Sequence, residues 1–206
     1  MSNMFNNDWI DGDKLFNDAP RIPFMKLQSG KNVCRIASNF SKVNTHWEKT
    51  RDGKQKKITC TDTNCPLCKL GHTPSTRYQM KVLDKTDPDN VEAKILEVGA
   101  TVIRQIIGFA KDEDYGDPTQ YDIKIQKEGT GRDTRYSVTA SPRRSEISAH
   151  EQELVDALPS MEEINKILPA DEIKKMNLDC FDNDDDFGSS EVSAKKSKAL
   201  DDWENL

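Results

Sequence analysis

Short stretches in which apolar and polar residues alternate recur along the first two thirds of the chain. Such alternation puts successive side chains on opposite faces of an extended backbone, so it predicts half-buried β-strands. Turn-forming residues separate the stretches, for example Asp52-Gly53. The expected strands lie at 23–29 and 32–36 (two strands or one long bent strand), 40–48, 57–59, 76–85, 93–98, 121–125 and 134–140.

One stretch has a different period. Its apolar residues recur every three or four positions, which predicts a helix over 101–110. These residues are Val102, Ile103, Ile106, Ile107 and Ala110. About six or seven short strands with a single intervening helix are typical of a small closed or partly open β-barrel. We therefore expect a mainly β core over residues 21–144.

The chain changes character after residue 144. Ser160 is followed three residues later by Glu163 and then by apolar positions, a capping box that begins a helix. Asp171 begins a second short helix, so residues 145–178 are expected to form a helical segment. From there on, acidic residues, Ser and Lys dominate and core formers are few, and a disordered acidic tail is predicted over 179–206.

The charge of the chain is distributed unevenly. The net charge is −6, and the balance of 34% hydrophobic against 32% charged residues indicates a core well short of the full 206 residues. Residues 1–20 hold one Lys against four Asp (−3), residues 21–144 hold 23 Lys and Arg against 15 Asp and Glu (+8), and residues 145–206 hold 6 against 17 (−11). A basic body between acidic ends suggests a polyanion-binding domain with a tail that can mimic the polyanion.

Three of the five cysteines lie close together and follow a histidine. The odd count and the clustering favour a reducing compartment and metal binding over a disulfide framework. Three thiolates and one imidazole are the ligands of a closed tetrahedral zinc site, and the Cys-Pro-Leu-Cys turn can point two sulfurs at one ion. The predicted pattern is His46-x13-Cys60-x4-Cys65-x2-Cys68.

The fourth ligand has two candidates. His46 is favoured because it closes a hairpin onto the cysteine turn, and His72, just after Cys68, is the rival. Cys34 is interpreted as a small core residue. His150 and Cys180 lie in polar sequence and are assigned no role.

A catalytic zinc is not expected. His46-Trp47-Glu48 and the paired cysteines superficially resemble the signature of zinc deaminases. Here, however, Pro66 lies between the cysteines instead of before them. Cys60 would also fill the open position that a catalytic zinc needs. The predicted site is therefore structural, and no enzymatic activity is expected.

Basic and aromatic residues are interleaved through the body of the chain. Proteins that bind single strands need this mixture, because cations follow the phosphates while aromatic faces stack on unpaired bases. The predicted DNA-binding residues are Arg35, Lys42, Trp47, Lys49, Arg51, Lys54, Lys56, Lys57, Tyr78, Lys81, Arg132, Arg135 and Tyr136.

The ordered combination of this zinc cluster, a barrel around it and an acidic tail after it resembles one family. It is similar to the zinc-containing single-stranded-DNA-binding protein (helix-destabilising protein) of T-even-type bacteriophages. The resemblance covers roughly residues 20 to 142 and the general plan of the tail. The gap before Cys60 is slightly longer than in that family and the gap between Cys60 and Cys65 is shorter, but no ligand is lost.

The resemblance implies an OB-fold, a five-stranded barrel with a zinc ribbon inserted at 46–72, whose groove coats and protects single-stranded DNA during replication, recombination and repair. It also implies an acidic tail that recruits replication and recombination proteins and competes with DNA. The expected partner-binding tip is Asp201, Asp202, Trp203, Glu204 and Leu206. One departure is the arm over 1–20, which is acidic here and basic in the family, so cooperative filament formation by the family's mechanism is not expected and self-association is left open.

The sequence thus predicts a non-enzymatic protein with one structural Zn²⁺ and single-stranded DNA as its partner. The N-terminal stretch has no signal peptide and no apolar run long enough for a membrane span, so a cytoplasmic location is expected, in the host cell if the protein is viral. The alternative is a zinc-ribbon regulator that recognises RNA or duplex DNA.

Overall fold

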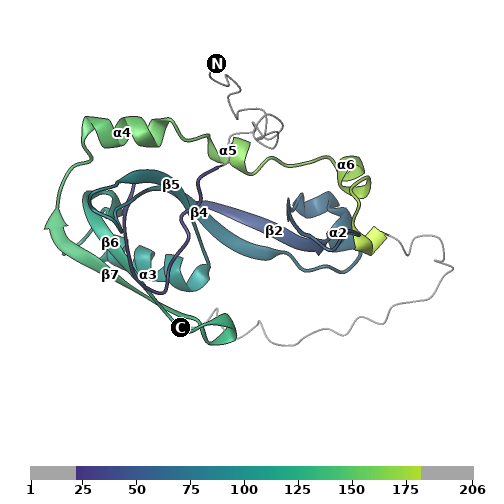
Figure 1. Cartoon of the computed structure of the whole chain (residues 1–206), viewed down its shortest axis with the longest axis horizontal. Helices are drawn as coiled ribbons and strands as arrows, with labels where there is room; N and C mark the ends of the chain where they lie inside the picture. The colour runs from purple at the N-terminus through teal and green to yellow at the C-terminus, as the bar shows by residue number, and fades with distance from the viewer. Residues whose placement is uncertain (1–21, 182–206) are drawn as a thin grey trace, which may run out of the picture.

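The computed structural model describes residues 22–181, in which seven strands form one antiparallel sheet (Figure 1). The predicted strands from residue 32 onward are confirmed, as is the predicted helix, α3 (Ala100–Lys111). The strands are β1 (Gly30–Ile36), β2 (Ser41–Lys49), β3 (Gln55–Thr59), β4 (Ser75–Asp84), β5 (Glu92–Val98), β6 (Tyr121–Glu128) and β7 (Arg135–Arg144).

The long strand β4 belongs to two lobes. Its first half pairs with β2, from Thr45↔Ser75 to Ser41↔Gln79, and its second half pairs with β1. Along its other edge β4 pairs with β5. We call β2, β3 and the helices α2 (Pro66–Lys69) and α6 (Ala170–Lys174) the ribbon lobe. Strands β1, β5, β6 and β7 form the sheet lobe with α3 and α4 (Ala149–Asp156). Strand β4 is shared, and Figure 1 shows the two lobes at its opposite ends.

The core of the sheet lobe follows from the alternation in its strands. In β6, Tyr121, Ile123 and Ile125 are fully buried and the residues between them are partly exposed. On α3, Val102, Ile103 and Ile106 join the same cluster. Each such side chain contributes about 1.5–3 kcal/mol when it leaves water. This burial positions β5, β7 and the start of α3 around one another.

The sheet is open. Among residues 22–181 no strand pairing joins β5 to β7, and α3 instead contacts both of them and β4. The closed five-stranded barrel is therefore not confirmed. The strand expected over 23–29 is reduced to a single parallel bridge between Phe24 and Ile95, with the Met25 amide donating to the Ile95 carbonyl at 2.9 Å.

Residues 145–181 run from one lobe to the other, and we call them the strap (Figure 1). The capping box predicted at Ser160 and Glu163 is confirmed at the start of α5 (Met161–Ile164). A second capping box, Ser148 with Glu151, begins α4. Residues 179–181, assigned to the tail by sequence, form a 3-10 turn, η5 (Asp179–Phe181), against the ribbon lobe.

The strap also covers one face of the sheet. The Lys81 ammonium on β4 donates to the carbonyls of Val155 (3.2 Å) and Leu158 (2.9 Å) at the end of α4. The Asn165 amide donates to the Gln79 side chain at 2.7 Å. The strap therefore covers that face of β4 at Gln79 and Lys81.

Two predicted regions lie outside the described residues. They are the acidic arm over 1–20 and the tail beyond 181, which carries the expected partner-binding residues Asp201, Asp202, Trp203, Glu204 and Leu206. No helix within 22–181 is long and apolar enough to cross a membrane.

Candidate metal centre and nucleic-acid interface

Four potential metal ligands meet in the ribbon lobe. His46 lies on β2, and Cys60 directly follows β3, whose hairpin with β2 turns at Gly53 with a φ of 82° that favours glycine. Cys65 caps α2 and Cys68 lies within it. The expected tight turn is thus one turn of helix, which begins at Pro66 because proline is favoured in the first helical turn.

The distances between the donor atoms match a tetrahedral site. The sulfurs of Cys60 and Cys68 are 3.6 Å apart, and His46 Nε2 lies 3.3 Å from the Cys65 sulfur and 3.4 Å from the Cys68 sulfur. Zn–S bonds of about 2.3 Å and Zn–N bonds of about 2.0 Å require separations of about 3.8 Å between sulfurs and about 3.5 Å between sulfur and nitrogen. These four residues could hold a metal ion, and the donor set is consistent with zinc.

The surroundings of the four donors set their protonation. Burial alone would raise the pKa of the Cys65 thiol, but backbone N–H groups of Cys68, Thr61 and Leu67 lower it below its ordinary value. Burial lowers the pKa of His46, which favours the neutral imidazole. Both shifts favour the form of the group that binds metal.

The other two thiols behave differently in the metal-free protein. Burial raises the pKa of Cys60 to about 12 and also raises that of Cys68. Both must lose a proton before they bind an ion, so metal binding releases protons at neutral pH. The backbone N–H of Asp62, a residue with a φ of 54°, donates to the Cys60 sulfur at 3.4 Å and supports its thiolate.

Of the two candidate histidines, the structure places His46 among the cysteines. Its side chain is 1% exposed, and its Nδ1 is buried without a hydrogen-bond partner among the described residues. His72 Nδ1 instead donates a hydrogen bond to the Glu48 carboxylate, at 2.8 Å.

Four of the ten predicted DNA-binding cations are exposed on the hairpin of the ribbon lobe. These exposed residues are Lys49, Arg51, Lys54 and Lys56. Lys54 forms an ion pair with Asp52 at 3.3 Å, which solvent screens. On the same hairpin, the Trp47 ring is 51% exposed and lies directly opposite Lys57. An exposed Trp between cations is the combination that stacks on an unpaired base.

Lys42 and Tyr78 form a second group, where β2 meets β4. They are directly paired across the two strands, and Lys42 is exposed while Tyr78 is half-buried. The Phe40 ring, 48% exposed, contacts Tyr78 edge-on with 6.0 Å between centroids. Sequence reasoning did not single out Phe40.

Two predicted contacts need correction or restriction. Arg35 is 1% exposed, and its guanidinium binds the Asp122 carboxylate (2.8–2.9 Å) and the Ser145 carbonyl (2.6 Å). It is a buried structural ion pair, so the phosphate contact predicted for Arg35 is wrong. The Lys81 ammonium is engaged by the strap, as described above.

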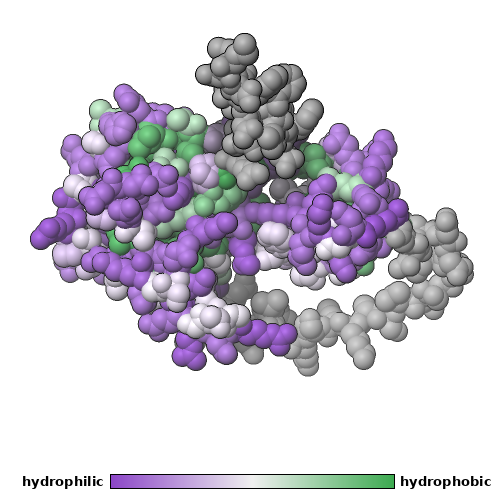
Figure 2. Space-filling model, viewed as in Figure 1, coloured by the Kyte–Doolittle hydropathy of each residue, from purple (hydrophilic) through white to green (hydrophobic). Residues whose placement is uncertain are grey.

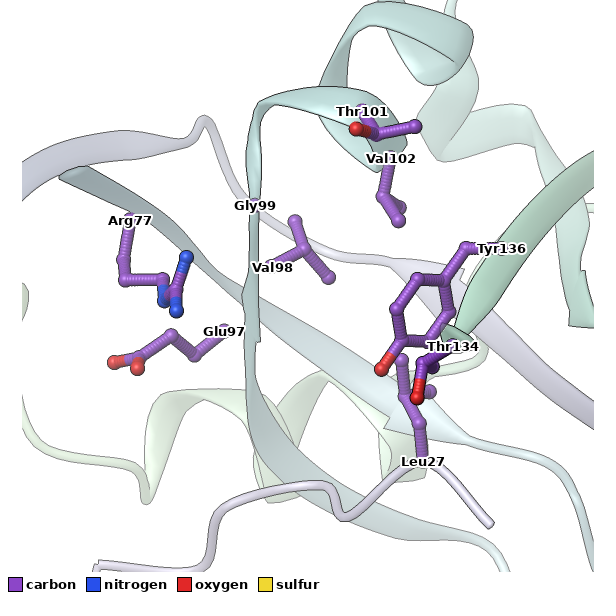
Figure 3. A pocket seen from close by; sticks show the side chains of 9 residues that line it. All are labelled: Leu27, Arg77, Glu97, Val98, Gly99, Thr101, Val102, Thr134 and Tyr136. Carbon is purple, nitrogen blue, oxygen red and sulfur yellow. The ribbon is translucent and has the colours of Figure 1, made fainter. Parts of the chain in front are cut away.

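A groove of about 370 Å³ opens where the end of β5, the start of α3 and the start of β7 meet (Figure 3). Arg77 and Glu97 lie beside it on one side of Gly99, and Tyr136 and Val98 on the other. The other lining residues are Leu27, Thr101, Val102 and Thr134. The predicted residues Arg132 and Arg135 are exposed and lie close to Thr134 in the chain, but they are not among the lining residues.

The groove connects to the ribbon lobe through side-chain contacts. The Lys57 ammonium forms an ion pair with Glu97 and lies 5.5 Å from the centre of the Phe24 ring. Lys57 is also the cross-strand partner of Trp47, which carries the exposed indole. Gln79 also donates to Glu97, at 2.7 Å, so this carboxylate is neutralised by protein groups.

Sequence reasoning missed Arg77, the cation that lines the groove itself. The available signal was its place in β4, where it alternates with the half-buried Tyr78 and so lies on the opposite face.

Figure 2 shows that hydrophilic residues dominate this view of the molecule, with hydrophobic residues gathered mainly over the sheet lobe.

Comparison with known proteins yields one informative relative. The chain is 25% identical over 152 residues to a probable ssDNA-binding protein of Escherichia phage T5. The match covers 62% of this chain and 58% of that protein, so the chain spans little more than half of its relative's length. No family model and no solved structure matches the chain. The T5 relative supports the ssDNA-binding class. The resemblance to the T-even-type family stays a prediction.

Proposed function

We propose that this protein binds single-stranded DNA with little sequence preference. The observation that carries the proposal is the groove lined by both Arg77 and Tyr136. Cations that follow the phosphates beside an aromatic face that accepts a base are the two components of a single-strand site, and each stacked base contributes about 1–3 kcal/mol. The name of the T5 relative supports the same class of ligand.

We propose further that the sheet lobe is a partly open OB-fold. β1 pairs with β4 and β6, β4 pairs with β5, β6 pairs with β7, and α3 lies between β5 and β6 in the chain. This connectivity supports a five-stranded Greek-key barrel with the ribbon inserted before β4. OB-folds bind oligonucleotides along their second and third strands and the neighbouring loops. The groove lies beside β4, β5 and the β6–β7 hairpin, which is the corresponding place.

The metal in this proposal is one structural Zn²⁺ held by His46, Cys60, Cys65 and Cys68. All four protein ligands are in place, so no coordination position is left for a substrate. We infer a binding protein rather than an enzyme. The four ligands would fix the hairpin that carries Trp47 and the basic residues.

The wider biological role is also a proposal. Coating of single strands in replication, recombination and repair fits a sequence-tolerant groove, and a cytoplasmic location follows from that role. We propose that the acidic tail competes with DNA and recruits partner proteins. Deletion of residues 182–206 should then tighten binding of single-stranded DNA, and unchanged affinity would refute competition by the tail.

The test is a titration of a labelled oligo(dT) and of a duplex of equal length, each at several salt concentrations. Single-strand binding should be tighter by orders of magnitude and fall steeply with salt. Arg77→Ala should lower the salt slope by about one phosphate contact. The matched control is Lys111→Ala, because Lys111 lies at the far end of α3, about 14 Å along the helix from the groove residue Val102.

Equal affinity for the two DNA forms would overturn the proposal and favour the duplex-binding regulator. Tighter binding of an RNA oligonucleotide would favour an RNA-binding ribbon. A loss of affinity in Lys111→Ala equal to that in Arg77→Ala would show that net charge, and not the groove, determines binding.

A further inference from the structure

A second cluster of metal-ligating side chains lies in the ribbon lobe, apart from the four-donor centre. Glu48 comes from β2, His72 follows α2, and Cys180 lies in η5 at the end of the strap. One donor atom from each residue lies within 4.8 Å of the others. Three segments that are distant in sequence thus bring a carboxylate, an imidazole and a thiol together.

Each of the three residues is held in place by its surroundings. Glu48 is only 8% exposed, and a buried carboxylate requires a proton, a cation or a hydrogen bond. The His72 amide donates to the Leu67 carbonyl at 3.0 Å, which fixes its backbone. Next to Cys180, Leu178 is fully buried and bridges to Thr50, which fixes η5 on the hairpin.

We propose that Glu48, His72 and Cys180 form a second binding site for a divalent metal ion of the zinc class. Cysteine, histidine and glutamate are all zinc ligands, and three protein ligands leave the fourth tetrahedral position to water. His72 Nδ1 and the Glu48 carboxylate are now 2.8 Å apart and share a hydrogen bond. Two ligands of one tetrahedral zinc are about 3.4 Å apart, so binding replaces this hydrogen bond and opens the pair by about 0.6 Å.

The two sites differ in openness and therefore in affinity. The first has four protein ligands and three thiolates, whereas the second has one thiolate and a His72 side chain that is 36% exposed. The second site should bind more weakly and exchange its ion faster. Because Cys180 belongs to the strap, an ion there would also fasten the end of the strap to β2.

The test is a Co²⁺ titration of the metal-stripped full-length protein, followed by absorbance and by metal analysis after gel filtration. The wild-type chain should bind two equivalents, the first with the charge-transfer absorbance of three thiolates and the second with that of one. Cys180→Ser and His72→Gln should each reduce the stoichiometry to one and leave the three-thiolate spectrum unchanged. His150→Gln is the matched control, since His150 is an exposed histidine on α4, and it should retain two ions.

Uptake of a single equivalent by the wild-type chain at saturating Co²⁺ would overturn the proposal. Two ions retained in both Cys180→Ser and His72→Gln would overturn it as well. Circular dichroism identifies a variant that fails to fold, and in that case Glu48→Gln replaces it. DNA titrations are read separately, so failure of the second metal site and failure of DNA binding are distinguishable.

Discussion

The sheet lobe and the ribbon lobe are stabilised in different ways. Within residues 22–181, the core of the sheet lobe contains 14 buried residues, whereas that of the ribbon lobe contains six. Two of those six are the candidate metal ligands Cys60 and Cys65, and two more, Ile173 and Leu178, come from the strap. Modules this small rarely bury enough apolar surface to fold without a metal or a cross-link. The sheet lobe therefore depends on apolar burial, whereas the ribbon lobe depends on a distant segment and on four donors that could hold a metal ion.

Removing a metal ligand should give the largest difference between the lobes. Structural zinc contributes apparent binding free energies of about 10 kcal/mol or more at neutral pH. Cys65→Ser should therefore abolish metal binding and unfold β2, β3 and α2, while β1 and β6 retain their protection from hydrogen exchange. Cys34→Ser, in the core of the sheet lobe, should give the reverse pattern. A uniform loss of protection in Cys65→Ser would show that the two lobes unfold as one unit.

Truncating the strap where it enters the ribbon lobe should have the next largest effect. Leu178 is fully buried, so Leu178→Ala should cost about 2–5 kcal/mol, measured as the free energy of opening for amides of β3 and α2. Ile167 is 62% exposed and lies on the same strap, so Ile167→Ala should change stability by less than about 0.5 kcal/mol. Equal effects of the two substitutions would mean that the strap does not complete the ribbon core.

The attachment of the strap to the sheet lobe should depend on pH. Burial would raise the pKa of Glu151, but Lys85 and the amide and hydroxyl of Ser148 lower it from 4.5 to about 2. Because the folded pKa is the lower one, this stabilisation is present above pH 4.5 and is lost as the pH falls toward 2. Thermal unfolding in that window should show a loss of about 3 kcal/mol.

The matched variant is Glu151→Gln, which cannot ionise. It should be less stable than the wild type at neutral pH and nearly as stable at pH 2. If the stability of the wild-type protein does not change between pH 5 and pH 2, the role given to the lowered pKa of Glu151 is wrong. Glu153→Gln, an exposed neighbour on α4, should behave as the wild type does.

The smallest expected effects test whether both lobes contribute to DNA binding. Trp47→Ala in the ribbon lobe and Tyr136→Ala in the sheet lobe should each weaken binding of oligo(dT) by about 1–3 kcal/mol, the contribution of one stacked base. The double variant should lose about the sum of the two, because the residues do not share a partner. Fluorescence anisotropy measures all three, and an effect confined to Tyr136 would restrict the interface to the groove.

The strands, α3 and the four-donor centre were predictable because their signals are local. Alternation over a few residues identifies β6, and the spacing of Cys65 and Cys68 places both sulfurs on one turn. The contribution of the strap to the ribbon core was not predictable. Ile173 and Leu178 contact residues more than 100 positions earlier, and nothing in their own sequence indicates which lobe they cover.

Electrostatic roles were the hardest to predict. Arg35 has the same local sequence signal as the exposed cations, yet Asp122 on the neighbouring strand neutralises it inside the protein. Arg77 was overlooked although it lines the groove. The sequence identifies a charged residue but not the oppositely charged residue that pairs with it. That pairing depends on the register of the strands in the sheet.

The sharing of β4 between the two lobes has a mechanical consequence. Its 10 residues form a continuous rod about 33 Å long, hydrogen-bonded along both edges at its middle. Rotation of one lobe against the other would break those bonds, so the spacing between Trp47 and the groove is set by the protein. A flexible polymer that touches both lobes must therefore adapt its conformation to this fixed spacing. The conformational entropy lost on binding is then lost by the ligand and not by the protein.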